Sequence, residues 1–141
     1  MDKHSKETRS YNMSRIRSVD SKPEVMVRKY LFSKGLRYRK NVKEMPGKPD
    51  IVLPKYKTVV FVNGFFWHGH QGCKYFVIPK TNTEYWTRKI SRNINRDNEA
   101  YTSLQSLGWN VLVVWECELK KDKINSTLEY LYYNILRNIK E

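Results

Sequence analysis

Apolar side chains recur with helical spacing in three segments of this 141-residue chain. The first begins with a capping box, in which Ser21 and Glu24 can satisfy each other's backbone donors, and it ends before a glycine. The second carries an apolar face from residue 86 to residue 104, and the third spans residues 126–139. Because this spacing keeps one side of a helix apolar, all three segments are predicted to be amphipathic helices.

Shorter apolar runs between these segments predict strands. Three of them, residues 36–41, 50–53 and 58–62, follow the first helix, and residues 109–115 follow the second. The run at 58–62 is apolar on both faces, as expected of a central strand covered by helices on each side. The resulting order, α-β-β-β-α-β-α, predicts an α/β fold with a mixed central β-sheet flanked by helices.

The remaining segment, residues 1–19, is predicted to be an arm that contacts a polyanion, with three arginines among apolar side chains: Arg9, Arg15 and Arg17. The formal net charge is +13, divided as +8 over residues 1–50, +5 over 51–100 and zero over 101–141. An uneven basic field attracts polyanions such as nucleic acids, because neutralised phosphates release counterions. A merely soluble basic protein is the alternative. No Gly/Ser linker divides residues 1–141, so we expect a single domain.

Other classes of protein are disfavoured by what the sequence lacks. The longest apolar stretch is interrupted by Asn63 and Gly64, whereas a membrane helix needs about 20 apolar residues. The first ten residues are polar and do not resemble a secretory signal. Two cysteines, Cys73 and Cys117, cannot build a disulfide framework. We therefore expect a cytoplasmic protein that does not bind membranes.

Three acidic residues are candidates for metal chemistry. Asp50 follows a proline at the start of a strand, and Glu24 lies at the start of the first helix. Acids placed in this way can hold a divalent cation against a phosphodiester, although Asp50 can also be an ordinary turn residue. Asp97 lies on the apolar face of the second helix, where a carboxylate requires a partner. That partner is either a metal-bound water or an arginine.

The segment after the central strand combines aromatic residues with histidines. Phe66 and Trp67 lie between two glycines, which favours a loop that presents them as a wedge for insertion between base pairs. Burial of both rings in the core is the alternative. His68 is a candidate general base or an ordinary polar residue.

Sulfur and imidazole groups also suggest a zinc site. Cys73 and Cys117 can converge on zinc with His70, and His68 is the nearest candidate for a fourth ligand. The spacing matches no standard zinc motif, and the alternative is a pair of buried free thiols.

Several motifs, taken together and in order, resemble the very short patch repair (Vsr) mismatch endonucleases. The matching stretches are TRSYNMSRI from Thr8, PGKPD from Pro46, FFWHGH from Phe65, KTNTEYW from Lys80 and WEC from Trp115. The resemblance extends from Thr8 to Cys117 and implies a fold related to type II restriction endonucleases.

The resemblance also implies roles for individual residues. Asp50 corresponds to the aspartate that binds Mg²⁺, and the backbone carbonyl of Val62 to a second ligand. His68 corresponds to the general base, and Glu24 and Asp97 to supporting acids near the metals and their waters. On the DNA side, the aromatic pair Phe66 and Trp67 corresponds to a wedge in the major groove, and Met13 to a residue that enters from the minor groove.

Two positions depart from the family pattern. The family often has a histidine, associated with the scissile phosphate, where this chain has Asn63; an amide can donate a hydrogen bond but cannot carry a proton charge. A family zinc cysteine is replaced by Phe65. His70, Cys73 and Cys117 match the other zinc ligands, with one additional residue between the histidine and the first cysteine.

The function that follows from the resemblance is Mg²⁺-dependent nicking of one DNA strand, 5′ to the thymine of a T·G mismatch. The expected substrate is double-stranded DNA that contains this mismatch, with a functional link to a cytosine-5 DNA methyltransferase. We expect a monomer that works in the bacterial cytoplasm at the nucleoid. The alternatives are a mismatch-binding protein with weak or silent catalysis and a related sequence-specific nuclease.

Overall fold

A four-stranded sheet and three helices make up the part of the chain that the computed structural model describes, residues 21–64, 70 and 77–138. The strands are β1 (Arg39–Lys40), β2 (Ile51–Leu53), β3 (Thr58–Asn63) and β4 (Asn110–Trp115). The helices are α2 (Lys22–Ser33), α3 (Thr83–Ser106) and α4 (Ile124–Leu136). Two short 3₁₀ helices, η1 (Pro54–Tyr56) and η2 (Glu116–Leu119), follow β2 and β4.

The sheet has the order β1-β2-β3-β4 and mixed strand directions. β1 pairs with β2 and β2 with β3 in antiparallel fashion, whereas β3 and β4 are parallel. β3 is a central strand, as its apolar pattern predicted, and it is almost completely buried. β4 was expected to be a buried strand but is mostly half-buried, because it lies at one edge of the described sheet. The mixed α/β architecture predicted from the sequence is confirmed.

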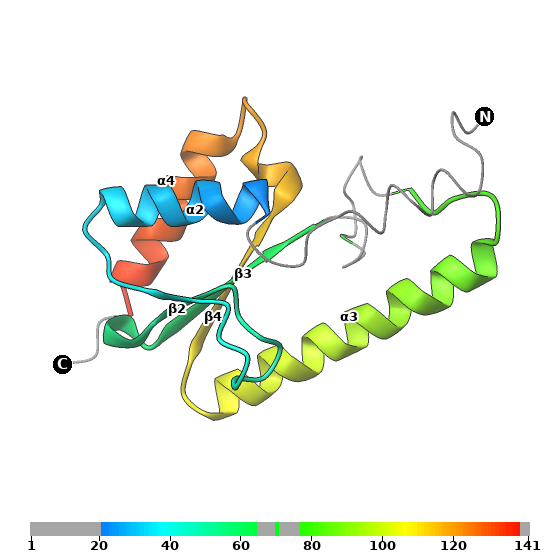
Figure 1. The fold of residues 1–141 in the computed structure, drawn as a ribbon, viewed down its shortest axis with the longest axis horizontal. Helices are drawn as coiled ribbons and strands as arrows, with labels where there is room; N and C mark the ends of the chain where they lie inside the picture. Colours follow the sequence, from blue (N-terminus) through cyan, green and yellow to red (C-terminus); the bar gives the residue numbers. More distant parts are fainter. Residues whose placement is uncertain (1–20, 65–69, 71–76, 139–141) are drawn as a thin grey trace.

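Helices cover both faces of the sheet (Figure 1). α2 and α4 lie together on one face, where the larger core cluster includes Val27, Val60 and Leu131. α3 crosses the opposite face, where Leu104 packs in a second cluster with Val59. α3 has 24 residues, and its N-terminal half extends past the sheet in Figure 1. No helix among the described residues is both long enough and apolar enough to cross a bilayer.

The start of α2 is fixed by the predicted cap. The Ser21 hydroxyl oxygen accepts the Glu24 backbone N–H at 3.4 Å, and the same hydroxyl donates to Glu24 Oε1 at 3.3 Å. The helix ends before Gly35, whose φ of +80° is the left-handed conformation that glycine adopts most easily. Glu24 is only 3% exposed, so the cap holds a carboxylate at the edge of the core.

Strand pairing brings chemically important residues to one end of the sheet. Because β3 and β4 are parallel, their carboxyl ends coincide, and Asn63 lies beside Trp115. β2 runs in the opposite direction, so its first residues lie next to the last residues of β3, with Ile51 opposite Val60. Asp50, immediately before β2, therefore lies at the same end of the sheet as Asn63.

Candidate functional site

The Asp50 side chain is held by the backbone of the neighbouring strand. Its Oδ2 atom accepts a hydrogen bond from the Val62 backbone N–H at 2.7 Å. This bond forms beyond the last paired residues of β2 and β3 and links the two strands there. A backbone donor thus keeps the carboxylate at the end of the sheet and favours its charged form.

Pro49 explains why the β2–β3 ladder supplies no donor to the Val62 carbonyl. Continuing the antiparallel register from Ile51 and Val60 places Pro49 opposite Val62. Proline has no N–H, so it cannot donate the ladder hydrogen bond that the Val62 carbonyl would otherwise receive from this position. In a strand the N–H and C=O of one residue point to the same side, and Val62 directs its N–H toward Asp50. Its carbonyl oxygen is therefore turned toward the same side as the carboxylate.

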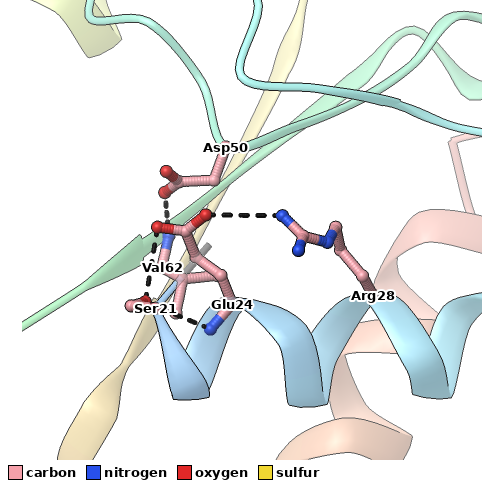
Figure 2. A network of polar contacts seen from close by, with 5 residues as sticks. All are labelled: Ser21, Glu24, Arg28, Asp50 and Val62. Carbon is pink, nitrogen blue, oxygen red and sulfur yellow. Dashed lines mark hydrogen bonds and ion pairs between the residues drawn. The ribbon is translucent and has the colours of Figure 1, made fainter. Parts of the chain in front are cut away.

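A second carboxylate reaches this region from α2. Glu24 is buried and forms an ion pair with Arg28 one turn later, with Oε2 3.5 Å from Nη1. Figure 2 shows the Glu24 and Asp50 carboxylates turned toward the same space, one from the first turn of α2 and the other from the start of β2. Because a buried carboxylate is costly without a cation, the Arg28 pair stabilises charge on Glu24.

The third predicted acid, Asp97, lies on α3 and is half-buried. Its influence is visible at Tyr101, one turn further along the same helix. The pKa of the Tyr101 phenol is raised to about 12, mainly by burial and also by the negative charges of Asp97 and Asp50, against a hydrogen bond from Asn63 that lowers it. Asp50 and Asp97 therefore both act on one phenol, although one precedes β2 and the other lies on α3.

Asn63 joins this group from the end of β3. It is 3% exposed, and its Nδ2 donates to the Tyr101 hydroxyl oxygen at 2.8 Å. Alternation along β3 places Asn63 on the same face as Val59 and Phe61, which is the face that packs against α3. The structure thus gathers Asp50, Asp97 and Asn63 around Tyr101.

His70 and Cys117 are also in contact. The His70 Nδ1 atom lies 3.1 Å from the Cys117 sulfur, and the imidazole stacks on the Trp115 ring at a centroid distance of 4.0 Å. Two of the three predicted zinc ligands are therefore together, although they are 47 positions apart in the sequence. An imidazole and a thiol are ligands that suit zinc.

Several predicted site residues lie outside the described residues, and the roles assigned to them stay predictions. They are the wedge residues Phe66 and Trp67, the proposed base His68, the zinc ligand Cys73, and the arm residues Arg9, Met13, Arg15 and Arg17. Within the described ranges, no group of three or more His, Cys, Asp and Glu side chains is arranged to hold a metal ion. Candidate metal ligands lie near each other at two places in these ranges: Asp50 with Glu24, and His70 with Cys117.

A family model described as DNA mismatch endonuclease Vsr matches residues 1–74 of the chain. The chain belongs to the Vsr family. The matched segment contains Glu24, Asp50 and Asn63, whereas Asp97 and Tyr101 lie beyond it on α3.

Relatives of this chain are similar to it over most of their length. A type II nicking enzyme, V.NmeAIP of Neisseria meningitidis, is 56% identical over 116 residues, which cover 82% of each chain. The nicking enzyme V.XorIIP of Xanthomonas oryzae is 47% identical over 84% of this chain and 86% of its own. The DNA mismatch endonuclease Vsr of Escherichia coli is 44% identical over 84% of this chain and 76% of its own.

Sequence reasoning assigned no site role to Tyr101. It placed this residue on the apolar face of its helix, where an aromatic ring is ordinarily a core residue. The available signal was its position four residues after Asp97, because residues at this spacing share a helix face. That spacing did not indicate that Asn63, 38 positions earlier, donates a hydrogen bond to the Tyr101 hydroxyl.

Proposed function

We propose that this Vsr-family protein is a DNA mismatch endonuclease that nicks one strand of a duplex, 5′ to the thymine of a T·G mismatch. The observation that carries the proposal is the fixed Asp50 carboxylate, held by the Val62 N–H at the end of the sheet that Glu24 also reaches. Family membership and the basic character of residues 1–100 support the same activity.

The donors around Asp50 suit a hard divalent cation such as Mg²⁺, which prefers oxygen ligands. Asp50 and the Val62 carbonyl oxygen are the proposed direct ligands, because both are turned to the same side of the sheet end. Glu24 and Asp97 are the proposed partners of metal-bound waters. When bound, Mg²⁺ would polarise the phosphoryl group and lower the pKa of the attacking water.

The chain's own residues are proposed to handle the proton and the phosphate. His68 takes the proton of the attacking water as general base, since imidazole titrates near neutral pH. Asn63 donates a hydrogen bond from its amide to an oxygen of the scissile phosphate, where a donor stabilises the negative charge that develops. The Arg28 guanidinium forms an ion pair with Glu24 within the core.

Mismatch preference is proposed to come from the wedge formed by Phe66 and Trp67. A T·G wobble pair stacks weakly, so inserting aromatic side chains there costs less free energy than at a Watson–Crick pair. Met13 approaches from the minor groove, and Arg9, Arg15 and Arg17 of the arm bind phosphates. The roles of these residues are proposed from the sequence and its resemblance to the Vsr family.

The proposal includes a structural zinc site formed by His70, Cys73 and Cys117. The contact between His70 and the Cys117 sulfur supports it, because two suitable ligands are already together. Phe65 replaces the fourth family ligand, so a water molecule or His68 completes the coordination. If His68 binds zinc, it is not available as the base.

Residues 1–141 are proposed to act as one domain and as a monomer, because a single active site suffices to nick one strand. The proposed substrate arises when a methylated cytosine is deaminated to thymine, which links the enzyme functionally to a cytosine-5 DNA methyltransferase. Its work would then take place on bacterial DNA, in the cytoplasm at the nucleoid.

The test is a nicking assay with Mg²⁺ and two labelled duplexes that differ only in one T·G pair. We expect cleavage of the mismatched duplex alone, 5′ to the thymine, and no cleavage when EDTA replaces Mg²⁺. Asp50→Ala should lose nicking but bind the mismatched duplex. Equal nicking by Asp50→Ala would contradict the assignment, whereas mismatch binding without nicking by the wild-type protein would favour a catalytically silent binding protein.

A further inference from the structure

The hydrogen bond between Asn63 and Tyr101 connects the end of β3 to the C-terminal third of α3. The donor–acceptor distance is 2.8 Å, and Asn63 is almost completely buried. The Tyr101 ring packs edge-on against Phe61, with a centroid distance of 4.9 Å and an interplanar angle of 62°. Because Phe61 is itself buried in the core, the phenol has little freedom, and its oxygen is a fixed acceptor for the amide.

This hydrogen bond engages one N–H of the Asn63 side-chain amide and sets the orientation of the amide group. An asparagine amide carries two N–H hydrogens on one planar nitrogen, so engaging one of them fixes the direction of the other. An amide without this bond would rotate about its terminal torsion, which is a broad and soft one. A donor that acts on a developing charge is most effective when its orientation is set before the reaction.

The surroundings of Tyr101 connect it to the rest of the site. The carboxylates of Asp97 and Asp50 both act on its phenol, together with burial, and its pKa of about 12 keeps the hydroxyl protonated near neutral pH. A neutral phenol adds no negative charge beside two carboxylates, which suits a region that must also accept a phosphodiester.

We propose that Tyr101 is a positioning residue of the nuclease site, which holds the Asn63 amide in the orientation that donates its second N–H to the scissile phosphate. The inference rests on the proposed function and adds to it a residue from α3. Asn63 replaces the histidine that is frequent at this position in the family, and Tyr101 supplies the orientation that the neutral amide needs.

Single-turnover nicking of the T·G duplex tests the proposal with a double-mutant cycle. Tyr101→Phe removes the acceptor oxygen and keeps the ring against Phe61, and we expect the nicking rate to fall about tenfold with duplex affinity unchanged within about twofold. Asn63→Ala should cause a similar loss, and the double variant should be no slower than Asn63→Ala. Tyr130→Phe, the same change at an exposed position of α4, should match the wild type.

A second measurement reports on the bond itself. In ¹⁵N-labelled protein, the side-chain amide signals of Asn63 are assigned by their disappearance in Asn63→Ala. We expect these signals to shift in Tyr101→Phe and to stay in place in Tyr130→Phe. Unchanged Asn63 signals in Tyr101→Phe would show that the hydroxyl does not hold the amide and would overturn the inference.

The remaining outcomes separate this inference from the proposed function. If the wild-type protein nicks normally, two results would overturn the inference alone. One is a Tyr101→Phe variant that nicks as fast as the wild type, and the other is a double variant in which the losses of the two single variants multiply. Loss of folding in Tyr101→Phe would assign the hydroxyl a structural role and would also overturn it. A wild-type protein that does not nick the mismatched duplex would remove the proposed function, and the inference with it.

Discussion

The backbone N–H of Val62 donates to Oδ2 of Asp50 across 2.7 Å, just beyond the point where pairing between β2 and β3 ends. Pro49 occupies the position opposite Val62 in the continued register, but its carbonyl oxygen accepts the Val42 N–H at 3.3 Å. The Asp50 carboxylate, in place of a backbone carbonyl, accepts the Val62 N–H. As a result, the acceptor at this end of the sheet is a carboxylate group instead of a neutral backbone group.

Asp50→Asn separates the charge of this side chain from its structural bond. The amide oxygen of asparagine can still accept the Val62 N–H, so we expect a melting temperature within about 3 °C of the wild type. The Mg²⁺-dependent nicking rate should fall at least about 100-fold, because a neutral amide is a much poorer ligand for Mg²⁺. Calorimetry and the nicking assay measure the two effects. A variant that retains more than about a tenth of the activity would remove Asp50 from the metal site.

Arg28→Met is expected to destabilise the protein. It removes the Arg28 cation from the buried carboxylate of Glu24, although the apolar side chain fills similar space. Breaking such a pair from one side should lower the free energy of unfolding by about 3 kcal/mol. Lys29→Met, at the exposed neighbouring position, should change it by less than about 0.5 kcal/mol. Urea denaturation of the two variants gives the comparison, and equal stabilities would mean that Glu24 does not depend on Arg28.

Gly47 is expected to tolerate no side chain, because its turn packs directly on α3. A Cβ at this position would lie 2.7 Å from the Cβ of Ala100 and 3.1 Å from the Phe61 ring, and its φ is +74°. Gly47→Ala should therefore cost about 3 kcal/mol, from left-handed strain and overpacking together. Gly35→Ala is the matched control: its φ is +80° with nothing within 4 Å, so strain alone should cost about 1 kcal/mol. Similar losses in chemical denaturation would contradict the predicted contact.

Stability at alkaline pH should depend on Tyr101. Its pKa is raised from 10.0 in the unfolded chain to about 12 in the folded protein, first by burial and then by Asp97 and Asp50. Between these values the unfolded state loses the proton and the folded state keeps it. The contribution is therefore complete below about pH 10 and is lost as the pH rises toward 12, by up to about 2 kcal/mol, which is less than the full shift implies because solvent screens a partly buried phenol. Urea denaturation of wild-type protein and Tyr101→Phe at several alkaline pH values should show a steeper decline for the wild type. Parallel declines would contradict the raised pKa.

Zinc content can be measured directly in protein purified without chelators. We expect about one equivalent of zinc in the wild type, and a clear decrease in Cys117→Ser, because the Cys117 thiol lies against the His70 imidazole. Ser126→Ala, an exposed change on α4, should leave the metal content unaltered. Less than about half an equivalent in the wild-type protein would count against the zinc site.

Local patterns were sufficient to predict the elements of this fold. The N-cap at Ser21, whose hydroxyl accepts the Glu24 N–H, and the glycine after α2 are confirmed, because a helix start and end depend on a few consecutive residues. The continuous apolar run of β3 correctly indicated a strand with both faces covered. The boundaries were less accurate: the predicted strand 36–41 is reduced to Arg39–Lys40, since a strand ends where its partner stops pairing.

The contacts of the site could not be predicted in the same way. Nothing near Asn63 in the sequence indicates Tyr101, and nothing near Val62 indicates that Asp50 accepts its N–H. Such contacts depend on strand register and on how α3 crosses the sheet, and both result from the packing of the whole core. Residue types and short-range spacing therefore identified the elements and several chemical groups, whereas long-range packing determined which of those groups meet.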